Sequence, residues 1–283
     1  MNNILKTFVF LTALTILLIY TGSILGGPNG ATYAFIFALL LNAGSYWFSD
    51  KIILSIYRAK KISKEDFPYL YNTVRELTTK SHLPLPQIYL IEDNTPNAFA
   101  TGRDPQHAAI AVTSGILNTL NEEELKGVIA HELSHIKNRD ILIGTIAATI
   151  AGAITMLASL ARWAMIFGGT QKNDEDNNPF AFLIMTILAP VAALLIQMAI
   201  SRSREYLADK SSAQMCENPL PLANALRKLH QKTIYQPMDA ATPATAHLFI
   251  VNPLRGNSIL NLFSTHPPID ARIKKLEALN NIN

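Results

Sequence analysis

The chain carries NEEELKGVIAHELSHIKNRD at positions 121–140. Its first residue is a favourable helix N-cap, and Glu124 can close a capping box with it. Apolar residues recur at helical spacing behind this cap, so the stretch predicts an amphipathic helix. On such a helix His131 and His135 lie one turn apart and can bind the same metal ion. Glu132 is offset from both histidines but close to their face, which suits a general base that acts on water.

A second segment supports a metal site. A catalytic zinc ion needs a third protein ligand and one open position. The segment 201–209, SRSREYLAD, places Glu205 and Asp209 on one face of a predicted helix. We expect Glu205 to be the third ligand and Asp209 to hold a ligand imidazole through a hydrogen bond. A helical face that carries His, Glu and His is also found on solvated surfaces, and the second acidic segment is what favours the metal site.

The composition excludes several classes of protein. Of the 283 residues only 16% are charged, and the mean hydropathy is +0.19, which is too apolar for an ordinary soluble enzyme and indicates membrane spans. The basic residues lie beside apolar runs rather than in one patch, so we expect no nucleic-acid partner. Cys216 is the only cysteine, which excludes an intrachain disulfide.

Two long apolar regions predict membrane hairpins. Residues 7–49 contain no charged side chain, and GGPNG interrupts them, so we expect spans near 7–26 and 31–49. A cleaved signal peptide is the alternative for the first of these. Apolar segments at 141–163 and 180–200 predict a second pair of spans, for which a buried core hairpin is the alternative.

Basic residues set the expected orientation. They follow the second and fourth predicted spans, so the N-terminus, the active site and the C-terminus are expected in the cytoplasm. A membrane hairpin returns the chain to the surface where it started, so His135 and Glu205 should meet just outside the bilayer. The expected division of the chain is a hairpin over 1–50, two halves of a catalytic domain over 51–140 and 201–283, and a second hairpin over 141–200.

The soluble parts show further periodic segments. A helix is expected over 64–80, and a strand over 87–91. Two apolar segments, 97–102 and 108–113, flank a turn and predict a β-hairpin. Two further helices are expected at 218–232 and 269–279, whereas 233–263 has no clear period.

Four motifs in order carry a resemblance to a known family. HELSH at 131–135, EYLAD at 205–209, PNAFATG at 96–102 and STHPP at 264–268 resemble those of the HtpX-type heat-shock membrane zinc metalloproteases, which are related to the CAAX prenyl endopeptidases. The resemblance implies a mainly α membrane protein with four transmembrane helices and a cytoplasmic zincin-like (gluzincin) α+β catalytic domain that contains a small sheet. It also implies a multi-pass endopeptidase of the bacterial inner membrane that removes misfolded membrane proteins, alongside an ATP-dependent membrane protease.

The same resemblance implies roles for individual residues. One zinc ion per chain would be bound by His131, His135 and Glu205, with Glu132 as the catalytic base. The predicted strand at 108–113 is similar in place to the edge strand that zincins pair with extended substrate, with Asn97 as a further candidate to hold substrate and Ala108, Ile110 and Val112 as the strand positions involved. His266 is a candidate to stabilise the oxyanion, and a capping or turn role is its alternative.

Two other functions stay open at this point. A membrane-bound zinc protein could hold clients for another protease without cleaving them, although such a protein has no use for Glu132 or for an open metal position. A prenyl-protein processing enzyme is the other possibility, but those relatives carry more membrane spans than the four expected here.

Overall fold

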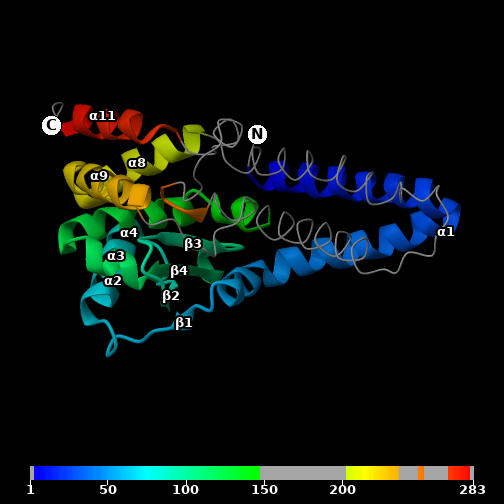
Figure 1. Cartoon of the computed structure of the whole chain (residues 1–283), viewed down its shortest axis with the longest axis horizontal. Coiled ribbons are helices and arrows are strands. Elements are labelled where there is room, and N and C mark those ends of the chain that lie inside the picture. The colour runs from blue at the N-terminus through cyan, green and yellow to red at the C-terminus, as the bar shows by residue number, and fades with distance from the viewer. Residues whose placement is uncertain (1–2, 147–201, 236–247, 252–266, 281–283) are drawn as a thin grey trace.

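The computed structural model describes residues 3–146, 202–235, 248–251 and 267–280. A long helical arm projects from a body in which helices cover a small sheet (Figure 1). Most of the predicted second pair of spans, and most of 233–263, lie outside the described residues.

The arm is formed by α1 (Asn3–Ile56), which folds back on itself (Figure 1). The reversal occurs at Gly27, whose φ of +58° is accessible to glycine at little cost. The two halves of the arm contact each other, because the side-chain amide of Asn42 donates a hydrogen bond to Oγ1 of Thr15 at 2.8 Å. In the part of the chain that the structure describes, one stretch, Gly27–Phe48, is long and apolar enough to cross a membrane. Two spans in this arm stay a prediction.

The sheet consists of β1 (Lys60–Lys61), β2 (Gln87–Ile91), β3 (Ala98–Gly102) and β4 (Ala108–Thr113) in the order β1-β2-β4-β3. The predicted strand at 87–91 and the predicted β-hairpin are confirmed: β3 pairs antiparallel with β4 around the short 3-10 turn η1 (Pro105–His107). β2 and β4 run parallel.

The expectation that 108–113 is an edge strand is wrong. β4 is bonded on both sides, to β2 and to β3, and all six of its residues are buried. A short strand of small and apolar residues without polar alternation is typical of the interior of a sheet. Ala108, Ile110 and Val112 face the main hydrophobic core, and among the described strands β3 is the edge strand beside β4.

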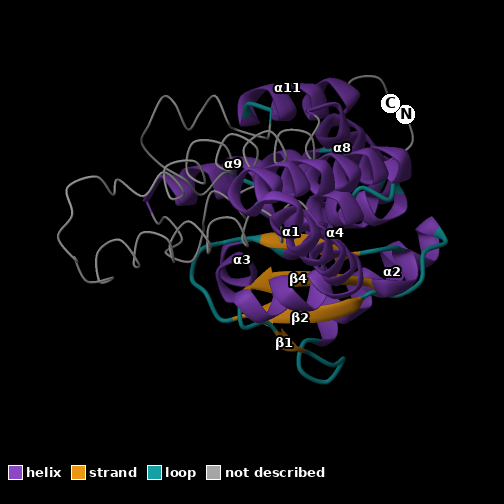
Figure 2. Ribbon diagram, turned by 90° about the vertical axis from the view of Figure 1, so that its right-hand side faces the viewer, coloured by secondary structure: helices purple, strands orange, loops and turns teal. Residues whose placement is uncertain are grey.

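The body also contains α2 (Pro68–Ser81), α3 (Ser114–Thr119), α4 (Glu122–Lys137), α8 (Arg202–Cys216), α9 (Leu220–Tyr235) and α11 (Ile269–Asn280). Residues 141–146 are helical as well. The helices predicted at 64–80, 121–140, 218–232 and 269–279 correspond to α2, α4, α9 and α11. Figure 2 shows α4, α8 and α9 stacked on one side of the sheet, with α11 outermost.

Each face of the sheet contributes to a separate core. Alternate strand residues pack with α4, and Leu133 on α4 is fully buried there. The other face packs against the end of α1, where Tyr57 contacts the rings of Phe99 and Phe249. Helix α4 therefore lies at the centre of the body, between the sheet and the outer helices, and its exposed surface is small.

Candidate metal centre and active site

The helix that carries the two histidines begins at the predicted cap. Oδ1 of Asn121 accepts a hydrogen bond from the backbone N–H of Glu124 at 2.9 Å, and Oε2 of Glu124 accepts one from the N–H of Asn121 at 3.0 Å. This reciprocal pair satisfies two donors of the first turn and sets the start of α4. The start of the helix in turn fixes which face carries His131 and His135.

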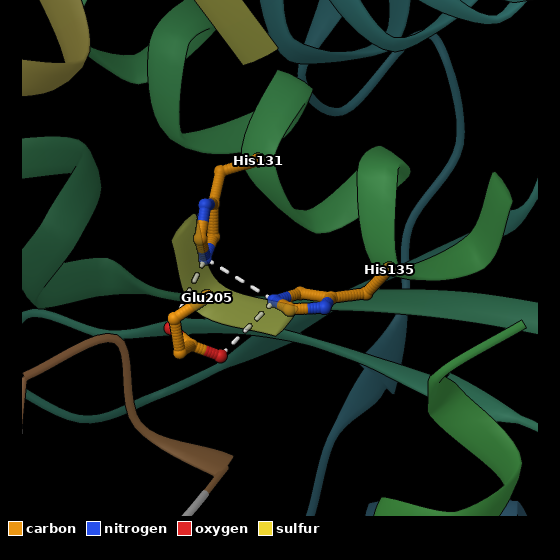
Figure 3. A group of neighbouring side chains, drawn as sticks. All are labelled: His131, His135 and Glu205. Atoms are coloured by element: carbon orange, nitrogen blue, oxygen red, sulfur yellow. Dashed lines mark hydrogen bonds and ion pairs between the residues drawn. The ribbon is translucent and has the colours of Figure 1, made fainter. Parts of the chain in front are cut away.

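Three side chains from two helices converge on one point (Figure 3). His131 and His135 project from α4, and Glu205 projects from α8. The two Nε2 atoms lie 3.2 Å apart, and the Glu205 oxygens lie 3.7 Å from His131 Nε2 and 3.5 Å from His135 Nε2. Four ligands arranged tetrahedrally at about 2.05 Å from a zinc ion lie about 3.3 Å from one another. The three separations therefore suit a single tetrahedral ion.

The outer nitrogen of each imidazole faces a carboxylate. Nδ1 of His131 lies 3.0 Å from Asp209, and Nδ1 of His135 lies 3.3 Å from Asp140. A carboxylate that accepts a hydrogen bond from Nδ1–H leaves the lone pair of Nε2 for a metal. Two lone pairs that face each other at 3.2 Å repel unless a proton or a metal cation lies between them. The donor set therefore fits a metal ion.

Asp140 was not anticipated from the sequence. It follows α4, and a left-handed residue, Arg139 with φ 57°, turns the chain so that Asp140 returns to the last turn of the helix. The N–H of Asp140 donates to the carbonyl of His135 at 2.9 Å. Burial lowers the pKa of His135, but the hydrogen bond to Asp140 and the charges of Glu205 and Glu132 outweigh it and raise that pKa to about 9. The feature of the sequence that could have identified Asp140 is an acidic residue just after the C-terminal end of the helix that carries His135.

Arg272 on α11 is the second residue that sequence reasoning missed. It is 0% exposed, and its guanidinium makes two hydrogen bonds to Asp209, of 2.9 and 2.7 Å. It also lies 3.4 Å from Oε2 of Glu205 and donates to the carbonyl of Ile250 at 3.3 Å. Burial opposes ionisation of Asp209, but Arg272 and His131 lower its pKa to about 2. The feature of the sequence that could have identified Arg272 is a basic residue on the apolar face of the predicted C-terminal helix.

The candidate base is held beside the metal ligands. Glu132 is 5% exposed, and its Oε2 accepts a hydrogen bond from the backbone N–H of Ala100 at 2.8 Å. Burial raises the pKa of Glu132, and the neighbouring histidines and the N–H of Ala100 act in the opposite direction. Because the N–H of Ala100 is bonded to Glu132, it points away from β4, and Ala100 lines the same cleft as His131, His135 and Glu205.

Asn97 does not face open solvent. It is fully buried, and its side-chain oxygen accepts a hydrogen bond from the N–H of Ile250 at 3.2 Å. Two hydrogen bonds therefore hold Ile250, and with it the segment 248–251, beside the cleft. The N–H of Ile250 donates to Asn97, and its carbonyl accepts from Arg272. The predicted oxyanion residue, His266, lies outside the described residues.

A cleft opens onto His131, His135, Glu205 and Glu132. Its lining also includes Phe99 and Ala100 of β3, the segment 248–250, and four residues around the end of α4 and the start of α8: Asp140, Ile141, Gly144 and Arg204. A chain laid in this cleft would pass the ligands and the buried carboxylate together, which is an arrangement for hydrolysis of an extended substrate.

Comparisons with known proteins identify the family of the chain. The model of the family described as Peptidase family M48 matches residues 64–280. A protein from Syntrophotalea carbinolica named Protease HtpX homolog is 55% identical over 97% of this chain and 98% of its own length. Proteins of the same name from Thermodesulfovibrio yellowstonii and Thermococcus kodakarensis are 56% and 53% identical, each over 97% of this chain and over 98% and 95% of their own lengths.

A solved structure shares the fold. The crystal structure of Ste24p from S. mikatae superimposes with a TM-score of 0.55 at 16% identity and covers 97% of this chain. The chain spans 65% of the length of Ste24p. The family match and the close relatives lead to one conclusion: the chain belongs to peptidase family M48 and is a membrane metalloprotease.

Proposed function

We propose that the chain is a zinc-dependent endopeptidase in which His131, His135 and Glu205 hold the ion and Glu132 is the general base. The observation that carries this proposal is the pair of Nε2 atoms, 3.2 Å apart, with Glu205 beside both and each Nδ1 facing a carboxylate. Two imidazoles and a carboxylate are the ligand set of a hydrolytic zinc site with one position open.

Zinc bound there supplies a Lewis acid that polarises the scissile carbonyl and acidifies water. Glu132 takes a proton from the attacking water while the new carbon–oxygen bond forms, and it returns a proton to the amine as the carbon–nitrogen bond breaks. The N–H of Ala100 keeps the carboxylate in place. His266 is the proposed donor to the oxyanion.

Substrate is proposed to bind as an added strand on the free edge of β3, in place of the expected pairing with β4. Ala100 links this edge directly to Glu132, so a peptide paired here lies beside the base. Proteins with membrane segments are the proposed substrates, with the active site at the cytoplasmic face of a multi-pass inner-membrane protein and with an ATP-dependent membrane protease as a functional partner. The apolar arm α1 and the cluster of basic residues after it support this orientation.

The test compares Glu132→Gln with Glu123→Gln in the full chain purified in detergent. Glu123 is exposed on the same helix, so its substitution is a matched control. We expect Glu132→Gln to keep its zinc, measured by elemental analysis, and to lose casein cleavage by at least about a hundredfold. Glu205→Ala should lose zinc as well as activity.

These variants also separate the protease from the non-cleaving adaptor. An adaptor would bind clients equally well with either Gln substitution, and neither would change the release of fragments. Cleavage by Glu132→Gln at the wild-type rate would refute the assignment of the base. Full zinc content in Glu205→Ala would remove Glu205 from the ligand set.

A further inference from the structure

The end of the arm and the strand β3 lie side by side, and two contacts join them. The ring of Tyr57, just after α1, lies 5.7 Å from the ring of Phe99, near the start of β3. The guanidinium of Arg103, just after β3, lies 5.1 Å from the centre of the Trp47 ring, within α1. A step forward along β3 is therefore a step back along α1, toward the apolar part of the arm.

The lengths between these contacts agree. The chain advances ten residues from Trp47 to Tyr57, and the N–H of Tyr57 still donates to the carbonyl of Ile53 at 3.2 Å, so the helical rise applies throughout. Ten residues of helix rise about 15 Å. The four residues from Phe99 to Arg103 rise about 13 Å in a strand. The two segments are therefore close to antiparallel, and β3 lies along the arm rather than across it.

The lining of the cleft is packed onto the same end of the arm. Ile53 and Leu54 of α1 are 0% and 6% exposed, and they belong to one buried cluster with Phe99 and the segment 248–249. Phe99 and that segment also line the cleft. The position of the arm therefore sets the position of the cleft.

Trp47 lies at the end of the apolar part of the arm. The stretch Gly27–Phe48 ends one residue later, and Lys51 is the first basic residue after it. Trp47 and Phe48 are both exposed. Exposed aromatic residues followed by a basic residue are typical of the boundary between the hydrocarbon and water. If Gly27–Phe48 crosses the membrane, the end of β3 beside Trp47 lies at the bilayer surface.

The geometry points to a fixed spacing between membrane and scissile bond: a substrate that carries a membrane helix is cleaved about three to five residues from that helix. This inference rests on the proposed function, in which substrate pairs with β3 and Glu132 is the base. Glu132 is bonded to the N–H of Ala100, which precedes Arg103 by three residues, or about 10 Å of strand. A substrate strand beside β3 therefore covers about 10 Å between the bilayer surface and the base. Three extended residues span this distance, and one or two more leave the membrane helix.

The test uses substrates with one membrane helix, a flexible Gly–Ser spacer and one casein sequence that the enzyme cleaves in detergent. The scissile bond lies one, three, five, ten or twenty residues from the helix, after the helix in one series and before it in another. Each substrate is reconstituted in liposomes with the zinc-loaded full chain. Its initial cleavage rate is divided by the rate for the same segment as a free peptide without the helix, which removes the effect of local sequence. Glu132→Gln supplies the background.

The expected result is a maximum of this ratio at five residues in one of the two series. At one residue the ratio should be at least about tenfold lower, because the bond cannot reach Glu132. At twenty residues it should be about eightfold lower, because the effective concentration of a slack tether falls roughly as the −3/2 power of its length.

A second readout does not depend on turnover. A bimane fluorophore is attached to Gln106→Cys, in the turn after Arg103, or to Glu123→Cys, at the start of α4, with Cys216 replaced by serine in both proteins. Both positions are exposed, and α4 begins at the end of the body far from the arm (Figure 1). In liposomes, lipids with a nitroxide on the headgroup should quench the fluorophore at position 106 and leave that at position 123 unchanged.

The inference is overturned if the ratio shows no maximum at intermediate spacing in either series. It is also overturned if the nitroxide lipids quench the two positions equally. Cleavage of casein by Glu132→Gln at the wild-type rate would instead refute the proposed function, and the quenching would still decide whether β3 ends at the bilayer surface.

Discussion

Replacement of Arg272 by methionine tests whether the buried guanidinium holds the metal ligands in place. Its side chain is 0% exposed and compensates two carboxylates that are themselves buried, Asp209 at 3% and Glu205 at 4% exposed. Removal of one partner from a buried, hydrogen-bonded ion pair costs about 3–5 kcal/mol. For a chain of this length that corresponds to a fall of roughly 10 °C in the unfolding midpoint. Zinc affinity should also fall about 10–100-fold, because Asp209 would no longer be fixed against His131.

The assay is thermal unfolding of the metal-free full chain in detergent, followed by zinc titration against a competing chelator. Lys274→Met on the same helix is the control, because Lys274 is exposed and its loss should change stability by less than about 0.5 kcal/mol. Arg272→Met combined with Asp209→Leu removes both charges, so it should lose at least about 2 kcal/mol less than the sum of the single variants. Additive losses, or a midpoint for Arg272→Met within 2 °C of wild type, would refute the reasoning.

Three further outcomes are expected. Asp140→Asn should weaken zinc binding about tenfold in chelator competition, because the carboxylate that orients His135 is lost. The pKa of Asp209 is lowered from 3.8 to about 2 in the folded chain, so its contribution of about 2 kcal/mol is present above pH 4 and is lost as the pH falls toward 2. Acid titration of stability should show this loss in the wild type, and Asp209→Asn should lack it. Gly127→Ala should cost about 1–3 kcal/mol in thermal unfolding, because the added Cβ would lie 2.8 Å from the backbone nitrogen of Leu222.

Local features of the chain were predictable because they depend on neighbours in the sequence. The capping box at Asn121, the helix behind it, the strand at 87–91 and the turn between β3 and β4 follow from residue types a few positions apart. The approach of Glu205 to the two histidines was expected from the membrane hairpin predicted between them, over 141–200, and the structure places the three side chains together, although their roles as metal ligands stay a proposal.

The order of the strands was not predictable from the same information. β4 follows β3 along the chain, and nothing in its residues indicates that β2 occupies its other side. A strand of alanine, isoleucine and valine suits any buried position, so the choice between edge and interior depended on a parallel pairing with a segment about 20 residues earlier. Because of this pairing, the sheet edge that we propose to bind substrate is β3 rather than β4.

The motif HExxH and the later acidic pair were enough to predict a metal-dependent hydrolase, because side chains one helical turn apart share a face wherever that helix lies. The residues that hold these side chains in place, Asp140 and Arg272, could not be identified in this way, because they act through contacts that form only in the folded chain. Asp140 returns to His135 through a left-handed residue, and Arg272 reaches Asp209 from a helix 63 residues further along the chain. Such contacts depend on how the helices pack against one another, and packing is a property of the folded chain as a whole rather than of any one segment.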